Sequence, residues 1–233
     1  MKLSALQIEQ LYAFTRQHFV EYYDLQSELV DHLAHAIEAE SAKNPALSFD
    51  EILQSEFKKF GIFGFMEVVE NRQKALTRRY HKIVWKHFIE FFRLPKIAIV
   101  AVSFTIVFVG LKYIRKAPEI YAILFGILTI VLIGKFIVDN YRRKRRQSGE
   151  KRWLFEEIIS GYGSIASCFI VPIQLLSTLS RNSEVMLSTD FSLYGFSALL
   201  IAYAVFCYII TVIIPSKAKE YLVQTYPEYA LMQ

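Results

Sequence analysis

The chain has 233 residues, of which 54% are hydrophobic and 21% charged, with a formal net charge of +5 and a mean hydropathy of +0.29. This apolar content exceeds that of an average soluble domain, and it excludes a disordered chain, a collagen-like chain and a small secreted disulfide scaffold. Cys168 and Cys207 both lie inside apolar segments, so we expect neither a reactive thiol nor a metal–thiolate cluster.

The first part of the chain, residues 1–75, is predicted to be a small cytoplasmic head made of helices. Four helices are expected before the first long apolar segment: 4–19, 22–43, 48–60 and 64–93. Two capping boxes support these starts, because Ser4 is followed by Gln7 and Ser48 by Glu51 at the spacing that satisfies backbone donors at a helix N-terminus.

The second expected helix carries ionisable side chains on one face: Asp24, Glu28, Asp31, His35 and Glu38. Spacings of four, three, four and three residues align them on a helix, and we call this set the acidic stripe. Residues 1–57 hold ten acidic against three basic side chains, so we expect the stripe to bind a protein partner or to be a solvated face. A divalent metal held by His32, His35 and neighbouring carboxylates is the alternative interpretation.

Three segments of the head carry a recognisable pattern: YYDLQSELVDHL at 22–33, LSFDEIL at 47–53 and FKKFG at 57–61. Over residues 4–75 the chain thereby resembles the HAAS domain, a small helical cytoplasmic domain that precedes several membrane spans in bacterial proteins of the permease-prefix kind. It departs from that domain at Phe63, where the family usually has proline. The resemblance implies a regulatory or accessory membrane protein, in some bacteria encoded beside PadR-type winged-helix repressors.

Residues 76–96 are predicted to form a basic juxtamembrane helix. Its basic side chains alternate with aromatic ones, as is typical of a helix that enters the membrane interface. We expect anionic lipid to bind four of them, each contributing about 1 kcal/mol near a membrane surface: Arg78, Arg79, Lys82 and Lys86. Nucleic acid is not an expected partner.

Four membrane-spanning helices are predicted beyond this neck: 97–114, 120–138, 158–180 and 191–215. A span needs about 20 mostly apolar residues, and the first two reach that length if Lys112 and Lys135 extend toward the headgroups. The fold class is therefore all-α, a small cytoplasmic helical head followed by a four-helix transmembrane bundle. Residues 216–233 form a predicted cytoplasmic tail.

The distribution of Lys and Arg predicts the orientation of these spans. The loop after the second span contains a basic run, for which we expect anionic lipid to be the partner as well: Arg142, Arg143, Lys144, Arg145 and Arg146. The positive-inside rule places this loop and the basic neck in the cytoplasm. We therefore expect a multi-pass protein of the bacterial inner membrane with both termini cytoplasmic. Glu9 interrupts the N-terminal segment, so no signal peptide is expected.

No catalytic pattern is recognisable, because the chain has no Gly-rich phosphate loop, no nucleophile elbow and no His-Glu-x-x-His motif. We expect no enzyme activity, cofactor or bound metal. The favoured interpretation is a regulatory or scaffold protein whose head binds a cytoplasmic protein, another membrane subunit or a second copy. An accessory subunit or small-solute permease is the alternative, with a pocket between the third and fourth spans lined by Gln174, Tyr203, Tyr208 and Thr211. A lipid-modifying enzyme that uses the basic run 142–146 is a third interpretation.

Overall fold

The computed structural model describes residues 2–114, 151–161 and 189–232, together with single helical positions between them: 127, 130, 134, 137, 138, 141, 174 and 177. Every regular element in these residues is a helix and none is a strand, which confirms the all-α class for the described part of the chain. The predicted span 120–138 and most of 158–180 lie outside the described residues, and so does the basic run 142–146.

Contacts between residues divide the chain into two compact units. The first contains Met1–Arg78, Gly149–Glu157 and Tyr226–Gln233, and the second contains Arg79–Ser148 and Ile158–Thr225. The head therefore forms one unit with two short segments that are distant in sequence. One of these segments precedes the predicted third span, and the other follows the predicted fourth.

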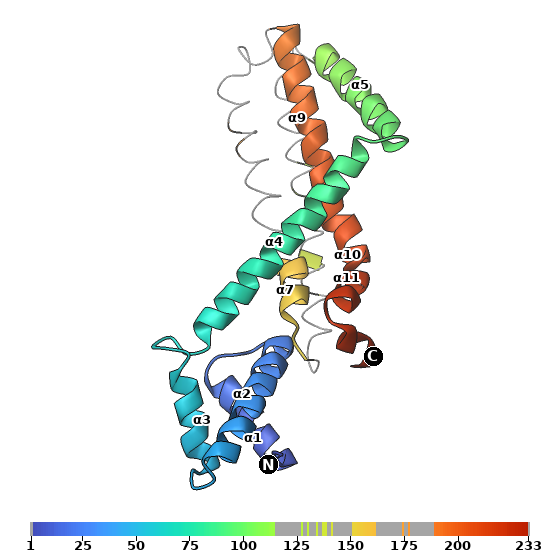
Figure 1. The fold of residues 1–233 in the computed structure, drawn as a ribbon. Helices are drawn as coiled ribbons and strands as arrows, with labels where there is room; N and C mark the ends of the chain where they lie inside the picture. Colours follow the sequence, from blue (N-terminus) through green and yellow to red (C-terminus); the bar gives the residue numbers. More distant parts are fainter. Residues whose placement is uncertain are drawn as a thin grey trace. The chain divides into compact units, whose positions relative to one another are not determined.

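Three helices build the head: α1 (Ala5–Gln17), α2 (Tyr23–Lys43) and α3 (Phe49–Lys58). α1 packs against α2, and α2 packs against α3 (Figure 1). Both predicted capping boxes are confirmed. In the first, the Gln7 N–H donates to Ser4 Oγ at 3.3 Å while the Ser4 N–H donates to Gln7 Oε1 at 2.9 Å. Glu51 and Ser48 repeat this exchange at the start of α3.

The core of the head combines aliphatic side chains from α1, α2 and α3 with the aromatic rings of Phe57 and Phe65. Its largest fully buried side chains are those of Leu11, Leu25, Leu33, Ile37, Ile52 and Phe65. Phe65 follows Gly64, whose φ of +53° is a conformation that L side chains rarely adopt. A Cβ at Gly64 would lie 2.8 Å from the Phe57 ring, so glycine allows the chain to turn tightly enough to bury Phe65.

α4 (Met66–Phe91) contributes its first half to the first unit and its second half to the second unit. Its bounds agree with the helix predicted over 64–93. One side of α4 is buried, and the residues on it follow helical spacing: Leu76, Tyr80, Val84 and His87. The opposite side is exposed along the helix.

Within the second unit, α5 (Lys96–Ile114) packs against α9 (Asp190–Tyr208) (Figure 1). Leu111 of α5 is buried against Leu193 and Phe196 of α9. Lys112, near the end of α5, lies 3.8 Å from Asp190 at the start of α9. The two helices are therefore antiparallel.

α5 and the helix that begins with α9 are each long and apolar enough to cross a membrane. The windows are Lys96–Tyr113, with a mean hydropathy of 1.8, and Asp190–Ser216, with a mean hydropathy of 2.5. They coincide with the first and fourth predicted spans. The protein thus has two candidate membrane-spanning helices among the residues described, and the four-span arrangement remains a prediction.

The second apolar helix changes its hydrogen-bond pattern near its end. α9 continues through a π-helical turn η1 (Ile209–Ile213) into α10 (Ile214–Ser216) and then α11 (Ala218–Thr225). Pro215 explains the change, because it cannot donate to the Thr211 carbonyl and its ring would crowd that carbonyl in a regular α-helix. The Thr211 hydroxyl donates to the Cys207 carbonyl at 2.7 Å in the same region.

Two short elements complete the described chain. α7 (Leu154–Gly161) begins in the first unit, four residues before the predicted start of the third span. The 3₁₀ helix η2 (Pro227–Met232) lies in the segment predicted to be a cytoplasmic tail, and it belongs to the same compact unit as the head.

Candidate functional site

A buried carboxylate in the first turn of α2 holds together three segments that are far apart in sequence. Asp24 is only 8% exposed. Its Oδ1 accepts the Leu154 backbone N–H at 3.1 Å, and its Oδ2 accepts the Tyr226 hydroxyl at 2.6 Å. We call Asp24, Trp153, Leu154 and Tyr226 the Asp24 junction. All four belong to the first compact unit.

The junction satisfies backbone groups at the starts of two helices. The first N–H groups of a helix have no partner within the helix. Leu154 opens α7, and its N–H is satisfied by the Asp24 carboxylate, whose negative charge also suits a helix N-terminus. In return, the Tyr23 N–H at the start of α2 donates to the Arg152 carbonyl at 2.8 Å. Hydrogen bonds thus run in both directions between α2 and residues 152–154.

Aromatic rings pack together beside these hydrogen bonds. Trp153 is 5% exposed and lies at the centre of the group. Its ring centroid lies 5.4 Å from that of Tyr23, 5.1 Å from that of Tyr226 and 5.3 Å from that of Tyr229. At the edge, Lys151 Nζ lies 3.8 Å from the Tyr23 ring centroid, in cation–π geometry.

The environment of Tyr226 favours its protonated form. Burial and the adjacent Asp24 carboxylate raise the pKa of the Tyr226 hydroxyl above its ordinary value of 10.0. The protonated hydroxyl is the form that donates to Asp24. The junction is therefore complete only while Tyr226 keeps its proton.

The acidic stripe changes character along α2. Asp24 is buried in the junction, whereas Asp31 and His35 have 75% of their side chains exposed. Glu28 lies 3.7 Å from Arg72 in an exposed ion pair, and Glu38 Oε1 accepts the Leu3 N–H at 2.9 Å. The structure therefore separates Asp24 from the other four residues of the stripe, which face solvent at least in part.

His35 and Asp31 form a local pair on this exposed part. His35 Nδ1 lies 2.8 Å from the Asp31 carbonyl oxygen and 3.4 Å from Oδ1 of the same residue. The hydrogen bond to that carbonyl, and then the carboxylate charge, raise the pKa of His35 above 6.5. Within the described residues, no group of three or more His, Cys, Asp or Glu side chains is placed to hold a metal ion. His32 lies beside the Phe60 ring instead.

Residues expected to bind lipid are placed by the structure only on α4. Arg78, Lys82 and Lys86 are exposed, and Arg79 is half-buried. The second group of expected lipid ligands, 142–146, lies outside the described residues.

The residues of the alternative permease pocket do not share one environment. Tyr203 is buried beside Cys207, whereas Tyr208 is half-exposed and its ring lies 6.1 Å from that of Phe91 on α4. Gln174 is an exposed helical position, and most of its predicted span lies outside the described residues. The structure therefore does not describe a pocket between the third and fourth spans.

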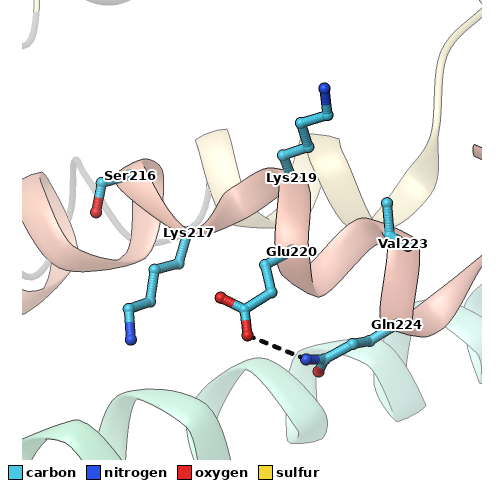
Figure 2. A pocket seen from close by; sticks show the side chains of 6 residues that line it. All are labelled: Ser216, Lys217, Lys219, Glu220, Val223 and Gln224. Atoms are coloured by element: carbon cyan, nitrogen blue, oxygen red, sulfur yellow. Dashed lines mark hydrogen bonds between the residues drawn. The ribbon is translucent and has the colours of Figure 1, made fainter. Parts of the chain in front are cut away.

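A hollow near the end of the second apolar helix is shallow and open to solvent. Its lining residues are Ser216, Lys217, Lys219, Glu220, Val223 and Gln224. Figure 2 shows that the side chains of Lys217 and Lys219 extend in different directions, while Gln224 Nε2 donates to Glu220 Oε1 at 3.2 Å. Since the two ammonium groups do not converge, the hollow has no centre of positive charge for an anionic ligand.

The described chain is thus a helical protein with two membrane-length helices and an intramolecular junction centred on a buried carboxylate. No protein-family model, curated protein or solved structure matches it.

Sequence reasoning did not identify Trp153, Leu154 or Tyr226 as site residues. A weak signal was present, since Trp153 directly follows two basic residues, and Tyr226 and Tyr229 lie close together near the end of the chain. Aromatic residues in otherwise polar segments are candidates for packing against a folded domain.

Proposed function

We propose that this protein is a regulatory or scaffold protein of the bacterial inner membrane, with a HAAS-like head that binds a protein partner in the cytoplasm. The partner surface is the exposed part of the acidic stripe on α2: Glu28, Asp31, His35 and Glu38. Four membrane spans and two cytoplasmic termini complete the proposal. The observation that carries it is the Asp24 junction, through which the head holds segments adjoining the membrane-spanning part.

The junction supports an even number of membrane crossings on either side of Leu154. Asp24, Leu154 and Tyr226 are hydrogen-bonded together, so they must lie on the same side of a membrane. If α5 crosses once between Asp24 and Leu154, a second crossing is needed before Leu154. If α9 crosses once, another is needed between Leu154 and α9. The predicted spans 120–138 and 158–180 supply these crossings, and the positive-inside rule makes the shared side cytoplasmic.

The junction also suggests how partner binding would reach the membrane part. α2 has its first turn buried in the junction, while Asp31 and His35, two to three turns further on, are exposed. A helix is stiff over that length, so a partner that shifts α2 would also strain the contacts of Trp153 and Tyr226. Residue 153 directly precedes α7, and residue 226 directly follows α11. Partner binding is thereby coupled to both helices.

The chemistry of the exposed stripe favours a partner with a basic surface. Exposed ion pairs each contribute only about 0–1 kcal/mol and are screened by salt, so several must act together. Complementary charge mainly raises the association rate and selects the partner. Binding should therefore weaken as the salt concentration rises.

Charge reversal on the stripe is expected to release the partner. In the full chain, purified in mild detergent after chemical crosslinking, Glu28→Lys with Asp31→Lys should lower partner recovery by about tenfold or more, because attractive pairs become repulsive. The matched control is Glu9→Lys with Asp50→Lys, which makes the same change of charge at exposed positions on α1 and α3. This control should retain the partner. Equal loss in both variants, or no partner with any of several crosslinkers, would contradict the proposal.

A further inference from the structure

The exposed side of α4 combines positive charge with large apolar side chains. Six of its residues lie on α4, and Phe92 directly follows the helix. The full set is Arg78, His81, Lys82, Trp85, Lys86, Ile89 and Phe92. We call this set the α4 exposed face. Their spacing places them on one side of a helix, and no Asp or Glu occurs among them. Trp85 is 62% exposed, although large aromatic side chains are usually buried when protein can cover them.

Contacts on the other side of α4 fix the rotation of the helix. His87 is buried, and its Nε2 lies 2.7 Å from the Tyr221 hydroxyl while Nδ1 lies 3.0 Å from Glu90 Oε2. Because a carboxylate only accepts hydrogen bonds, Nδ1 carries a proton and donates to Glu90. Val84, one turn before His87, is also buried. The α4 exposed face therefore points away from α11.

Two contacts show how far α4 reaches along the apolar helix Asp190–Ser216. The Phe91 ring lies 6.1 Å from the Tyr208 ring, at an interplanar angle of 85°. Tyr208 is eight residues before Ser216, where the apolar window ends, which at 1.5 Å per residue is about 12 Å inside that end. His87 contacts Tyr221, five residues beyond that end, so the end of the apolar window falls beside the last turn of α4, between His87 and Phe91. The last turn of α4 therefore lies at the membrane interface when α9 spans the bilayer. This step rests on the membrane topology proposed above.

We propose that the α4 exposed face is a docking surface for the anionic phospholipid surface of the same membrane. Arg78, Lys82 and Lys86 bind the headgroup phosphates, and Trp85 and Ile89 enter the boundary between headgroups and acyl chains. Trp is enriched at that boundary, and basic side chains beside it are attracted by anionic lipid. The absence of carboxylates from the face matches the negative charge of the surface it meets.

The two tryptophans of the chain make a direct test possible. Trp85 is exposed on α4, whereas Trp153 is buried in the Asp24 junction. The full chain, reconstituted in bilayers with lipids brominated on the upper acyl carbons, should show strong quenching of tryptophan emission. Trp85→Phe should remove this quenching and leave the emission of Trp153 unchanged. Two results would contradict the proposal. Quenching of Trp85 by aqueous acrylamide but not by brominated lipid would show that the face is exposed to water. Quenching by neither would show that a second copy or another protein covers the face.

The headgroup contacts have a separate test. Spin-labelled anionic and zwitterionic lipids measure the preference of the protein for negative charge, and each of Lys82→Gln and Lys86→Gln should lower that preference by about fivefold. Lys74→Gln, an exposed lysine in the first half of α4, is the matched control and should change it little. An unchanged preference in Lys82→Gln and Lys86→Gln would overturn the assignment of headgroup binding. Alkaline carbonate washing of membranes tests the proposed spans separately. A chain that stays in the membrane but shows no lipid preference would contradict only the lipid proposal, whereas a chain that is washed off would contradict the spans.

Discussion

Asp24→Ala is expected to release residues 151–155 and the C-terminal segment 226–232 from the head. The substitution leaves two buried donors, the Leu154 N–H and the Tyr226 hydroxyl, without their acceptor. An unsatisfied buried polar group costs about 1–3 kcal/mol, so the two groups together should destabilise the closed junction by about 2–6 kcal/mol. The fraction of molecules in which the junction is open would then rise at least about 30-fold.

Limited proteolysis of the full chain measures this opening. Chymotrypsin cleaves after aromatic residues, and Tyr226 and Trp153 are protected by burial while the junction is closed. Asp24→Ala should accelerate cleavage at both sites in proportion to the open fraction. Asp31→Ala is the matched control, since it removes the same side chain from an exposed position of the same helix. Equal cleavage rates in the two variants would show that the Asp24 hydrogen bonds do not hold the segments.

Alkaline pH is expected to open the same junction without any substitution. The pKa of Tyr226 is raised in the folded protein by burial and by Asp24, above the 10.0 of the free side chain. A group whose folded-state pKa exceeds its unfolded value contributes fully below the unfolded pKa and loses that contribution as the pH rises. Protection of Tyr226 should therefore be constant up to about pH 9 and fall steeply above about pH 10.

Tyr226→Phe provides the control for this pH dependence. Phenylalanine keeps the ring that packs against Trp153 but has no hydroxyl to ionise. The variant should be less protected than the wild type at neutral pH, because Asp24 loses one of its two donors, and its protection should change much less above pH 10. Hydrogen–deuterium exchange of residues 151–157, corrected for the intrinsic rate at each pH, reports the opening without a protease. An equally steep loss in Tyr226→Phe would assign the titration to another group.

The helices of the head were predictable because their signals are local. Ser4 and Ser48 begin capping boxes, and each box lies within four consecutive residues of the chain. The apolar windows of α5 and α9 were predictable for the same reason, since length and composition alone identify them. Such features depend on near neighbours in sequence and need no knowledge of tertiary packing.

The environment of Asp24 could not be predicted in this way. Helical spacing places Asp24 and Asp31 on one stripe, but it does not reveal which part of the stripe another segment covers. The two partners of Asp24 are 130 and 202 residues away in sequence. The 3₁₀ helix at 227–232 has too few residues for a periodic pattern, so the sequence predicts only a cytoplasmic tail there.

The position of α4 near the membrane was predictable, but the direction in which each of its side chains points was not. Its basic and aromatic residues predicted a helix near the membrane, but composition does not distinguish Trp85 from Phe91. The structure separates them, since Trp85 is exposed and Phe91 contacts Tyr208. That difference arises from packing against α9 and α11, which begin at Asp190 and Ala218, far along the chain from α4.

The proposed partner surface and the proposed lipid face both depend on the membrane topology of the chain. Fusion of a reporter that is active only outside the cytoplasm measures it directly. Reporters placed after Gln233, and between residues 146 and 151, should be silent, since the Asp24 junction puts residues 24, 154 and 226 on one side of the membrane. The same reporter after Ser183, in the loop predicted between the third and fourth spans, should be active. Activity after Gln233 together with silence after Ser183 would contradict this topology.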